Sequence, residues 1–126
     1  MEEKRFINQI GMGVDQHGHD NDCTEAAVKA VKNAISNNCL TGLSEICGLN
    51  DTKIPVRMKV HVKLGVPYPE RIDSDKVLSA VPFGQKTIEI VKGGLIAKGI
   101  MIKGLGDTSD NIIVCNAAVS VSVISS

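Results

Sequence analysis

The chain has 126 residues and a mass of 13.4 kDa, the size of one domain, and its 14 basic side chains balance 14 acidic ones. Zero net charge and an aromatic content of 2% exclude a strongly basic nucleic-acid binder with stacking platforms for bases. We therefore expect one domain over residues 1–126, with an aliphatic core and no nucleic-acid partner.

The sequence carries no membrane or export signal. Residues 1–5 are mostly charged, and no stretch reaches the ~18 apolar residues of a membrane span. We therefore expect a cytoplasmic protein without a membrane partner. The cysteines form no C-x-x-C pair, which favours buried free thiols over a zinc ribbon or a redox dithiol; they are Cys23, Cys39, Cys47 and Cys115.

The first half of the chain predicts a strand followed by helices. Residues 5–10 are typical of a short strand. A helix begins near Asp22, because Asp22 can cap it and Glu25 follows three residues later, as in a capping box. Its apolar stripe has helical spacing: Ala27, Val31, Ala34 and Ile35. Residues 41–49 predict a further short helix whose inward residues are Leu43 and Ile46.

The clearest strand covers residues 56–64, where apolar and polar side chains alternate strictly. One face of this strand is therefore core, and its apolar residues are Val56, Met58, Val60, Val62 and Leu64. The other face is entirely basic and carries Arg57, Lys59, His61 and Lys63. An anionic or carbonyl-rich ligand could bind across the basic face, with a solvated surface as the alternative.

The second half predicts a brief helix opened by Asp73 and then three strands. Residues 87–91 and 95–103 are typical of two strands of a hairpin, because Gly93 and Gly94 lie between them. A polar loop over residues 104–111 precedes the last strand, residues 112–124.

The predicted element order is β-α-β-α-β-β-β. We expect an α+β fold with a single mixed or antiparallel sheet and one main helix packed on one face. The last strand is a candidate edge, because its alternating serines and valines carry little charge to prevent pairing with another chain. A homo-oligomer formed through strands is therefore expected.

A polar cluster fills residues 11–22, which we expect to connect the first strand to the first helix. It holds two histidines and three aspartates. Side chains in such a connection lie beside a helix N-terminus, where binding sites often form. Gly11 and Gly13 would allow positive φ or the close approach of a ligand. The dinucleotide fingerprint fails, because Gln16 stands where its third glycine is required.

Three interpretations of this cluster remain open. If residues 15–19 are extended, Asp15, His17 and His19 project on one face and could bind zinc or a similar divalent ion. In a metal-free acid–base site, Asp15 would orient His17 as a general base, a role suited to a side chain that titrates near neutral pH. In the third interpretation the aspartates only cap and turn the chain, and the histidines are solvated.

The pattern G-x-G-x-D-x-H-G is matched at every defined position by Gly11, Gly13, Asp15, His17 and Gly18. On this motif the chain resembles a small uncharacterised family of bacterial proteins with longer plant members, over most of its length. The resemblance implies that the five residues form a site, in which the three glycines contribute to ligand binding. It supplies no reaction and no cofactor, and His19 lies outside the motif.

The run of residues 60–72, which ends in Pro-Glu-Arg-Ile, resembles a segment of the ring-opening amidohydrolases that cleave cyanuric acid and barbiturate. Those enzymes have three similar repeats around a threefold axis and a serine activated by lysine. The resemblance implies that Lys63 is a catalytic lysine and that this chain is one repeat of a trimer. No serine of this chain matches the nucleophile.

These observations lead us to expect a small enzyme acting on a polar ring or amide substrate, with Asp15, His17 and Lys63 as catalytic residues and His61 as a ligand-binding neighbour. The alternative is a non-catalytic protein that binds a small ligand or a metal. We expect a homo-oligomer, with a trimer preferred, because a site shared between subunits would let Lys63 meet the Asp15 and His17 loop.

Overall fold

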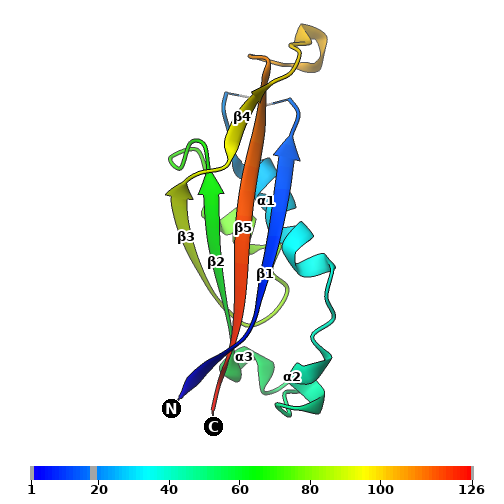
Figure 1. The fold of residues 1–126 in the computed structure, drawn as a ribbon, viewed down its shortest axis with the longest axis vertical. Helices are drawn as coiled ribbons and strands as arrows, with labels where there is room; N and C mark the ends of the chain where they lie inside the picture. Colours follow the sequence, from blue (N-terminus) through cyan, green and yellow to red (C-terminus); the bar gives the residue numbers. More distant parts are fainter. Residues whose placement is uncertain (1, 18–19, 126) are drawn as a thin grey trace.

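A computed structural model describes residues 2–17 and 20–125, which form one five-stranded sheet with all helices on one side (Figure 1). The strands are β1 (Glu3–Asp15), β2 (Met58–Val66), β3 (Gln85–Lys92), β4 (Leu95–Lys98) and β5 (Asn111–Ile124). The helices are α1 (Thr24–Ser36), α2 (Thr41–Glu45), α3 (Ile54–Arg57), α4 (Ser74–Leu78) and the 3-10 turn η1 (Lys103–Leu105). The predicted α+β class, with one mixed sheet and one main helix on one face, is confirmed.

The last strand, β5, lies in the centre of the sheet, so its prediction as an edge is wrong. The strand order is β1-β5-β2-β3, and β4 pairs with β5. β1 is antiparallel to β5 on one side, while β2 and then β4 are antiparallel to it on the other. The valine and serine alternation therefore separates two sheet faces: Val119 and Val121 face the helices, and Ser120 faces away.

The predicted hairpin of residues 87–91 and 95–103 does not form. β3 pairs in parallel with β2, and β4 pairs with β5 and ends at Lys98. The chain crosses the end of β2 between them, where Gly93 N–H donates to Val66 O at 2.9 Å. Gly94 has φ of 62°, a conformation that glycine adopts easily. The two glycines therefore mark a crossing of strands rather than a hairpin turn.

The first strand is longer than predicted, because β1 continues from residue 10 through Asp15. Five residues of the expected connecting loop are thus strand residues, paired with β5 in an unbroken register from Ile7 to Asp15. Gly11 and Gly13 face α1, and neither has positive φ, so the positive-φ alternative is wrong.

The close approach of α1 to β1 explains why these positions are glycine. A Cβ on Gly13 would overlap backbone atoms of Ala26 and Ala30, and a Cβ on Gly11 would overlap those of Ala30 and Ala34. The three alanines recur every four residues on one helix face and are fully buried. The pairing of small residues on both elements lets the helix backbone rest on the strand.

The predicted basic strand begins two residues late. Residues 56 and 57 belong to α3, which has a proline in its first turn, and Val56 is exposed rather than core. From Met58 onward the alternation is as predicted, with Met58, Val60, Val62 and Leu64 buried. In α2, Leu43 is buried as expected, but Ile46 lies beyond the end of the helix and is exposed.

The predicted cap is confirmed at α4, whereas the predicted capping box of Asp22 and Glu25 at α1 does not form. Asp22 Oδ1 accepts the Thr24 N–H at 2.9 Å, although Cys23 stands at the N-cap position of α1. Asp73 caps α4 by accepting the Lys76 N–H at 3.2 Å. The Asp73 N–H in turn donates to Thr24 Oγ1 at 2.9 Å, which ties α4 to the start of α1.

The sheet face turned away from the helices, called here the open face, carries no helix (Figure 1). On this face, lysines and other polar side chains lie on β2 and β3, and exposed apolar side chains lie on β1 and on β4, including Ile10, Met12 and Leu95. Among the described residues, no helix is long and apolar enough to span a membrane.

Candidate functional site

The end of β1 and the loop that precedes β5 come together at the end of the molecule opposite the termini (Figure 1). Residues 20–22 follow β1 and its turn, and residues 99–110 form the loop before β5, which includes η1. Backbone and side chains join the two segments: Asp20 N–H donates to Thr108 Oγ1 at 3.0 Å, and Asn111 Nδ2 donates to Asn21 Oδ1 at 3.1 Å.

His17 and Asp107 form the third and strongest link. His17 Nδ1 lies 2.8 Å from Asp107 Oδ2. The Asp107 side chain is fully buried, whereas the His17 side chain is 36% exposed. A carboxylate accepts hydrogen bonds and cannot donate them, so Nδ1 carries the shared proton and Nε2 is left as the basic nitrogen. The pair therefore has the arrangement of a histidine base held by a buried carboxylate.

The backbone of the loop before β5 also holds the Asp107 side chain in place. Its Oδ2 accepts the Ile102 N–H at 2.8 Å, so the loop backbone fixes the same oxygen that faces His17. Such a hydrogen bond keeps a partner of a catalytic histidine in one orientation. Asp107 is therefore the carboxylate that orients the ring of His17.

Asp15, which the sequence assigned to that role, acts on the backbone instead. It is 8% exposed and faces the helix side of β1 at the end of the strand. Its Oδ1 accepts the His17 N–H at 3.2 Å. Asp15 therefore shapes the turn that presents His17, and Asp107 contacts the ring.

Sequence analysis missed Asp107 because it lies 90 residues from His17 along the chain. The available signal was the polar loop before the last strand. If that strand pairs antiparallel with the first, the end of the first strand meets the start of the last, and the polar loop meets His17. The pairing itself could not be derived from the residues.

Two residues after the motif adopt an unusual backbone conformation. Asp20 has φ of 53° and Asn21 has φ of 59°, in the left-handed region that is costly for residues other than glycine. Their contacts with Thr108 and Asn111 stabilise this conformation. Residues 20 and 21 are therefore held in place by the loop before β5 and its first residue.

The predicted metal site includes a residue outside the described part of the chain. Gly18 and His19 both fall in the gap between residues 17 and 20, so their predicted roles in ligand and metal binding stay predictions. In residues 2–17 and 20–125, no group of three histidine, cysteine, aspartate or glutamate side chains could hold a metal ion.

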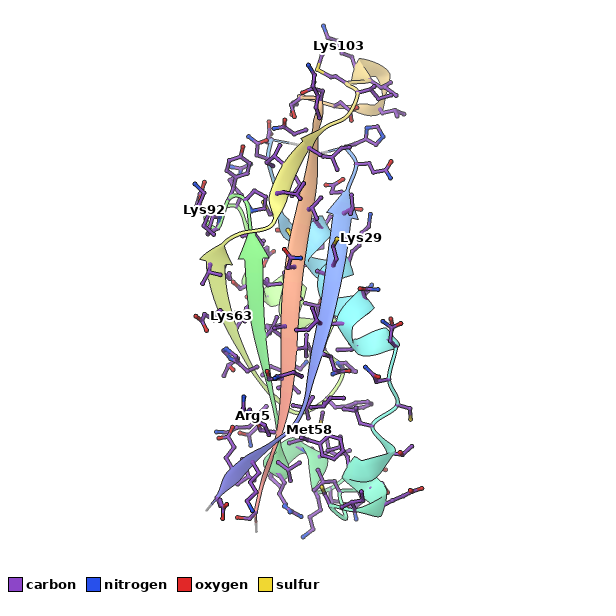
Figure 2. All side chains as sticks on the ribbon, in the orientation of Figure 1. Arg5, Lys29, Met58, Lys63, Lys92 and Lys103 are labelled. Atoms are coloured by element: carbon purple, nitrogen blue, oxygen red, sulfur yellow. The ribbon has the colours of Figure 1, made fainter. Side chains whose placement is uncertain are left out.

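Lys63 and His61 lie on the open face, away from His17. Lys63 Nζ is 3.7 Å from Glu89 Oε2, and His61 Nδ1 is 2.7 Å from Thr87 Oγ1. Lys63 stands opposite Ala118 of β5 and Asp15 opposite Ile113, five residues apart, or about 17 Å along the strand. Within one chain, Lys63 therefore does not reach the pair formed by His17 and Asp107. Figure 2 labels Lys63 on the sheet and Lys103 in the distant loop before β5.

All four cysteines are free, as expected, but only Cys23 and Cys115 are buried. Cys115 Sγ lies 3.9 Å from Cys23 O, and Cys115 of β5 is paired with Gly13 of the motif. Burial raises the pKa of the Cys115 thiol to about 12 and also raises the pKa of Cys23. Both thiols are thus protonated and unreactive at neutral pH, while Cys39 is exposed.

The sequence of this chain matches a known protein family. A family model described as a conserved hypothetical protein, Lin0512_fam, matches residues 5–121. The chain belongs to the Lin0512 family. The matched residues include most of β1 with the motif, His17 and Asp107, so the site described above lies inside the matched region.

The chain is also similar to a protein of known crystal structure. A protein from Nostoc punctiforme, described as an FtsZ-like protein of unknown function, is 41% identical to this chain, and the match covers 99% of each chain with a TM-score of 0.85. The search of curated proteins found no match. The expectation of a small, uncharacterised conserved family is therefore confirmed, while the motif's role and the resemblance to amidohydrolases stay predictions.

Proposed function

We propose that this Lin0512 protein is a small acid–base enzyme in which His17 removes a proton and Asp107 holds the imidazole. The observation that carries the proposal is the 2.8 Å contact between His17 Nδ1 and a fully buried Asp107 carboxylate. A partly exposed ring can reach a substrate, and a buried acceptor on the opposite nitrogen fixes its tautomer. A solvated surface histidine has no need of either feature.

The substrate class that we propose is a polar ring or amide, and the reaction is hydrolysis of its C–N bond. His17 Nε2 takes a proton from water, and the resulting hydroxide attacks the carbonyl carbon. The imidazolium then returns the proton to the departing nitrogen as the C–N bond breaks. Asp107 stabilises the charged ring between the two steps, and Asp15 keeps the turn in position.

The alternative function is ligand binding without turnover. The contacts of Asp20 and Asn21 with the loop before β5 and its first residue support this function, because a binding loop needs a fixed conformation. The two functions differ in what His17 does. Binding alone needs its hydrogen bonds, whereas catalysis needs its basic nitrogen.

The test is a ring-opening assay with barbiturate and cyanuric acid, followed by the loss of ultraviolet absorbance. We expect turnover by the wild-type protein and a loss of at least about 100-fold in His17→Gln, the scale of one acid–base group. Lys32→Gln is the control, because Lys32 is exposed on α1 and lies outside the proposed site. Ligand-dependent stabilisation without turnover would favour the binding function. If the protein shows neither turnover nor stabilisation, both functions are contradicted.

We also propose that the open face is the interface of a homo-oligomer, as an extension of the sequence-based expectation. Ile10 is 68% exposed and Met12 55% exposed on adjacent open-face positions of β1, and Leu95 of β4 is exposed on the same face. Apolar patches of this kind mark interaction sites. A second copy suits the face, because its lysines and Glu89 offer both signs of charge to an identical surface. The preference for a trimer rests on the resemblance to the three-repeat amidohydrolases.

A further inference from the structure

A cavity of about 360 Å³ lies between the sheet and the short helices, on the side away from the open face. The sheet forms one wall, and the end of α1, α2 and the segment after α4 form the others. Met58, labelled near the terminus end of the sheet in Figure 2, is one of its lining residues. Gln9 also lines the cavity and lies six residues before Asp15 on β1. The cavity is therefore about 20 Å from the His17 site.

The wall of the cavity is mostly aliphatic. Buried side chains from the strands and from α2 supply most of it: Leu43, Leu49, Val60, Val119 and Val121. Among the described lining residues there is no aspartate, glutamate, lysine, arginine or histidine. A charged ligand would lose its hydration here without gaining a partner, so the lining favours a neutral molecule.

Polar side chains also line the cavity, among them Gln9, Asn38 and Ser44, and Gln9 is the buried one of these three. Gln9 is 4% exposed and points to the helix side of β1, at a position where its neighbours along that face are apolar. Its Oε1 accepts from Asn38 Nδ2 at 3.4 Å. Within the described part of the chain, Gln9 Nε2 donates to no protein atom. Gln9 Nε2 is accessible from the cavity, so a ligand oxygen there would accept its hydrogen bond.

The opening of the cavity carries one of the few aromatic rings of the chain. Phe83 lines the cavity and is largely exposed, although it is large and apolar. An exposed aromatic ring at a cavity opening provides contact area for the apolar part of a ligand.

We propose that this cavity binds a small neutral molecule with an aliphatic body and one hydrogen-bond acceptor, such as a ketone, ester or lactone. Its volume lies at the lower end of the ~300–1,000 Å³ range of small-molecule sites. The aliphatic part contacts the valine and leucine side chains, and the acceptor oxygen receives the Gln9 Nε2 hydrogen bond. This site is separate from the proposed enzyme site and does not depend on it.

The test compares 2-undecanone with undecanoate, which has the same chain length but a negative charge. Binding is measured by amide chemical-shift changes in NMR titrations of the full chain. We expect saturable shifts with 2-undecanone at residues that line the cavity, and binding by undecanoate that is at least about tenfold weaker. Equal affinity for the two probes, or no saturable shift with 2-undecanone, would overturn the proposal.

Two matched variants test the role of the amide. Gln9→Leu removes the unpaired donor and should weaken 2-undecanone binding by roughly 3- to 10-fold, as expected for one hydrogen bond. Asn8→Leu removes an amide from the neighbouring residue, whose side chain contacts Ser120 on the open face, and should leave the affinity unchanged. Circular dichroism verifies that both variants fold. Equal affinities in the two folded variants would contradict recognition by Gln9.

Discussion

Gly13 of β1 lies against Ala30 of α1 so closely that a single added methyl group would overlap the helix backbone. The motif glycine therefore sets the distance between the main helix and the sheet. Because the same strand ends at Asp15 and turns into His17, this packing also fixes where the candidate site begins. The functional motif is thus partly a packing motif.

Gly13→Ala should lower the free energy of unfolding by about 1–3 kcal/mol or more, because the helix must move away from the strand. Urea unfolding followed by circular dichroism measures the change. Gly104→Ala is the matched control, since a Cβ there meets no atom within 4 Å. If Gly13→Ala is as stable as Gly104→Ala, the close helix packing is not required.

Asp107→Asn should change the tautomer of His17, because an amide no longer holds the proton on Nδ1 as a carboxylate does. Long-range proton–nitrogen NMR spectra report the protonated nitrogen directly, without a substrate. In the ring-opening assay we expect kcat to fall by about 100-fold or more. An unchanged tautomer in a folded variant would remove Asp107 from its proposed role.

Met12→Lys should dissociate the proposed oligomer, because it places a charge in the apolar part of the open face. Light scattering after size exclusion gives the mass at micromolar concentration. We expect a multiple of 13.4 kDa for the wild type and a mass near 13.4 kDa for the variant. A monomeric wild type would reject the oligomer, and a dimer or tetramer would reject the analogy with three-repeat amidohydrolases.

The stability of the protein should fall as pH rises above about 9. The pKa of Cys115 is raised from 9.0 to about 12 in the fold, so between these values the unfolded chain loses a proton that the folded chain retains. The Cys115 thiol therefore makes its full contribution to the free energy of unfolding below pH 9, and this contribution is lost as the pH rises toward 12. Each proton changes the slope by up to about 1.4 kcal/mol per pH unit.

Cys115→Ala should therefore flatten the dependence of unfolding free energy on pH between 8 and 10, whatever its effect at pH 7. Cys39→Ala is the control, because Cys39 is exposed and its removal should leave the slope unchanged. Urea titrations at several pH values give both slopes. Identical slopes in the wild type and Cys115→Ala would show that this thiol does not control alkaline stability.

The sequence by itself determined the local elements, because short-range periodicity and capping chemistry decide them. The alternation from Met58 to Leu64 and the cap at Asp73 are examples, and both were predictable from neighbouring residues. The motif also located one half of the candidate site, since Asp15 and His17 lie two residues apart and share a hydrogen bond.

Only the tertiary structure decided which strands pair and which carboxylate reaches His17. Strand pairing depends on contacts between residues far apart in the chain, and local patterns carry no register for them. A strand of alternating serines and valines can therefore lie at the edge or in the centre of a sheet. In the same way, Gly93 is compatible with a hairpin turn or with a chain crossing between two strands. Asp107 meets His17 because β1 and β5 are antiparallel neighbours along most of their length, and α1 packs against both strands with its buried alanine face.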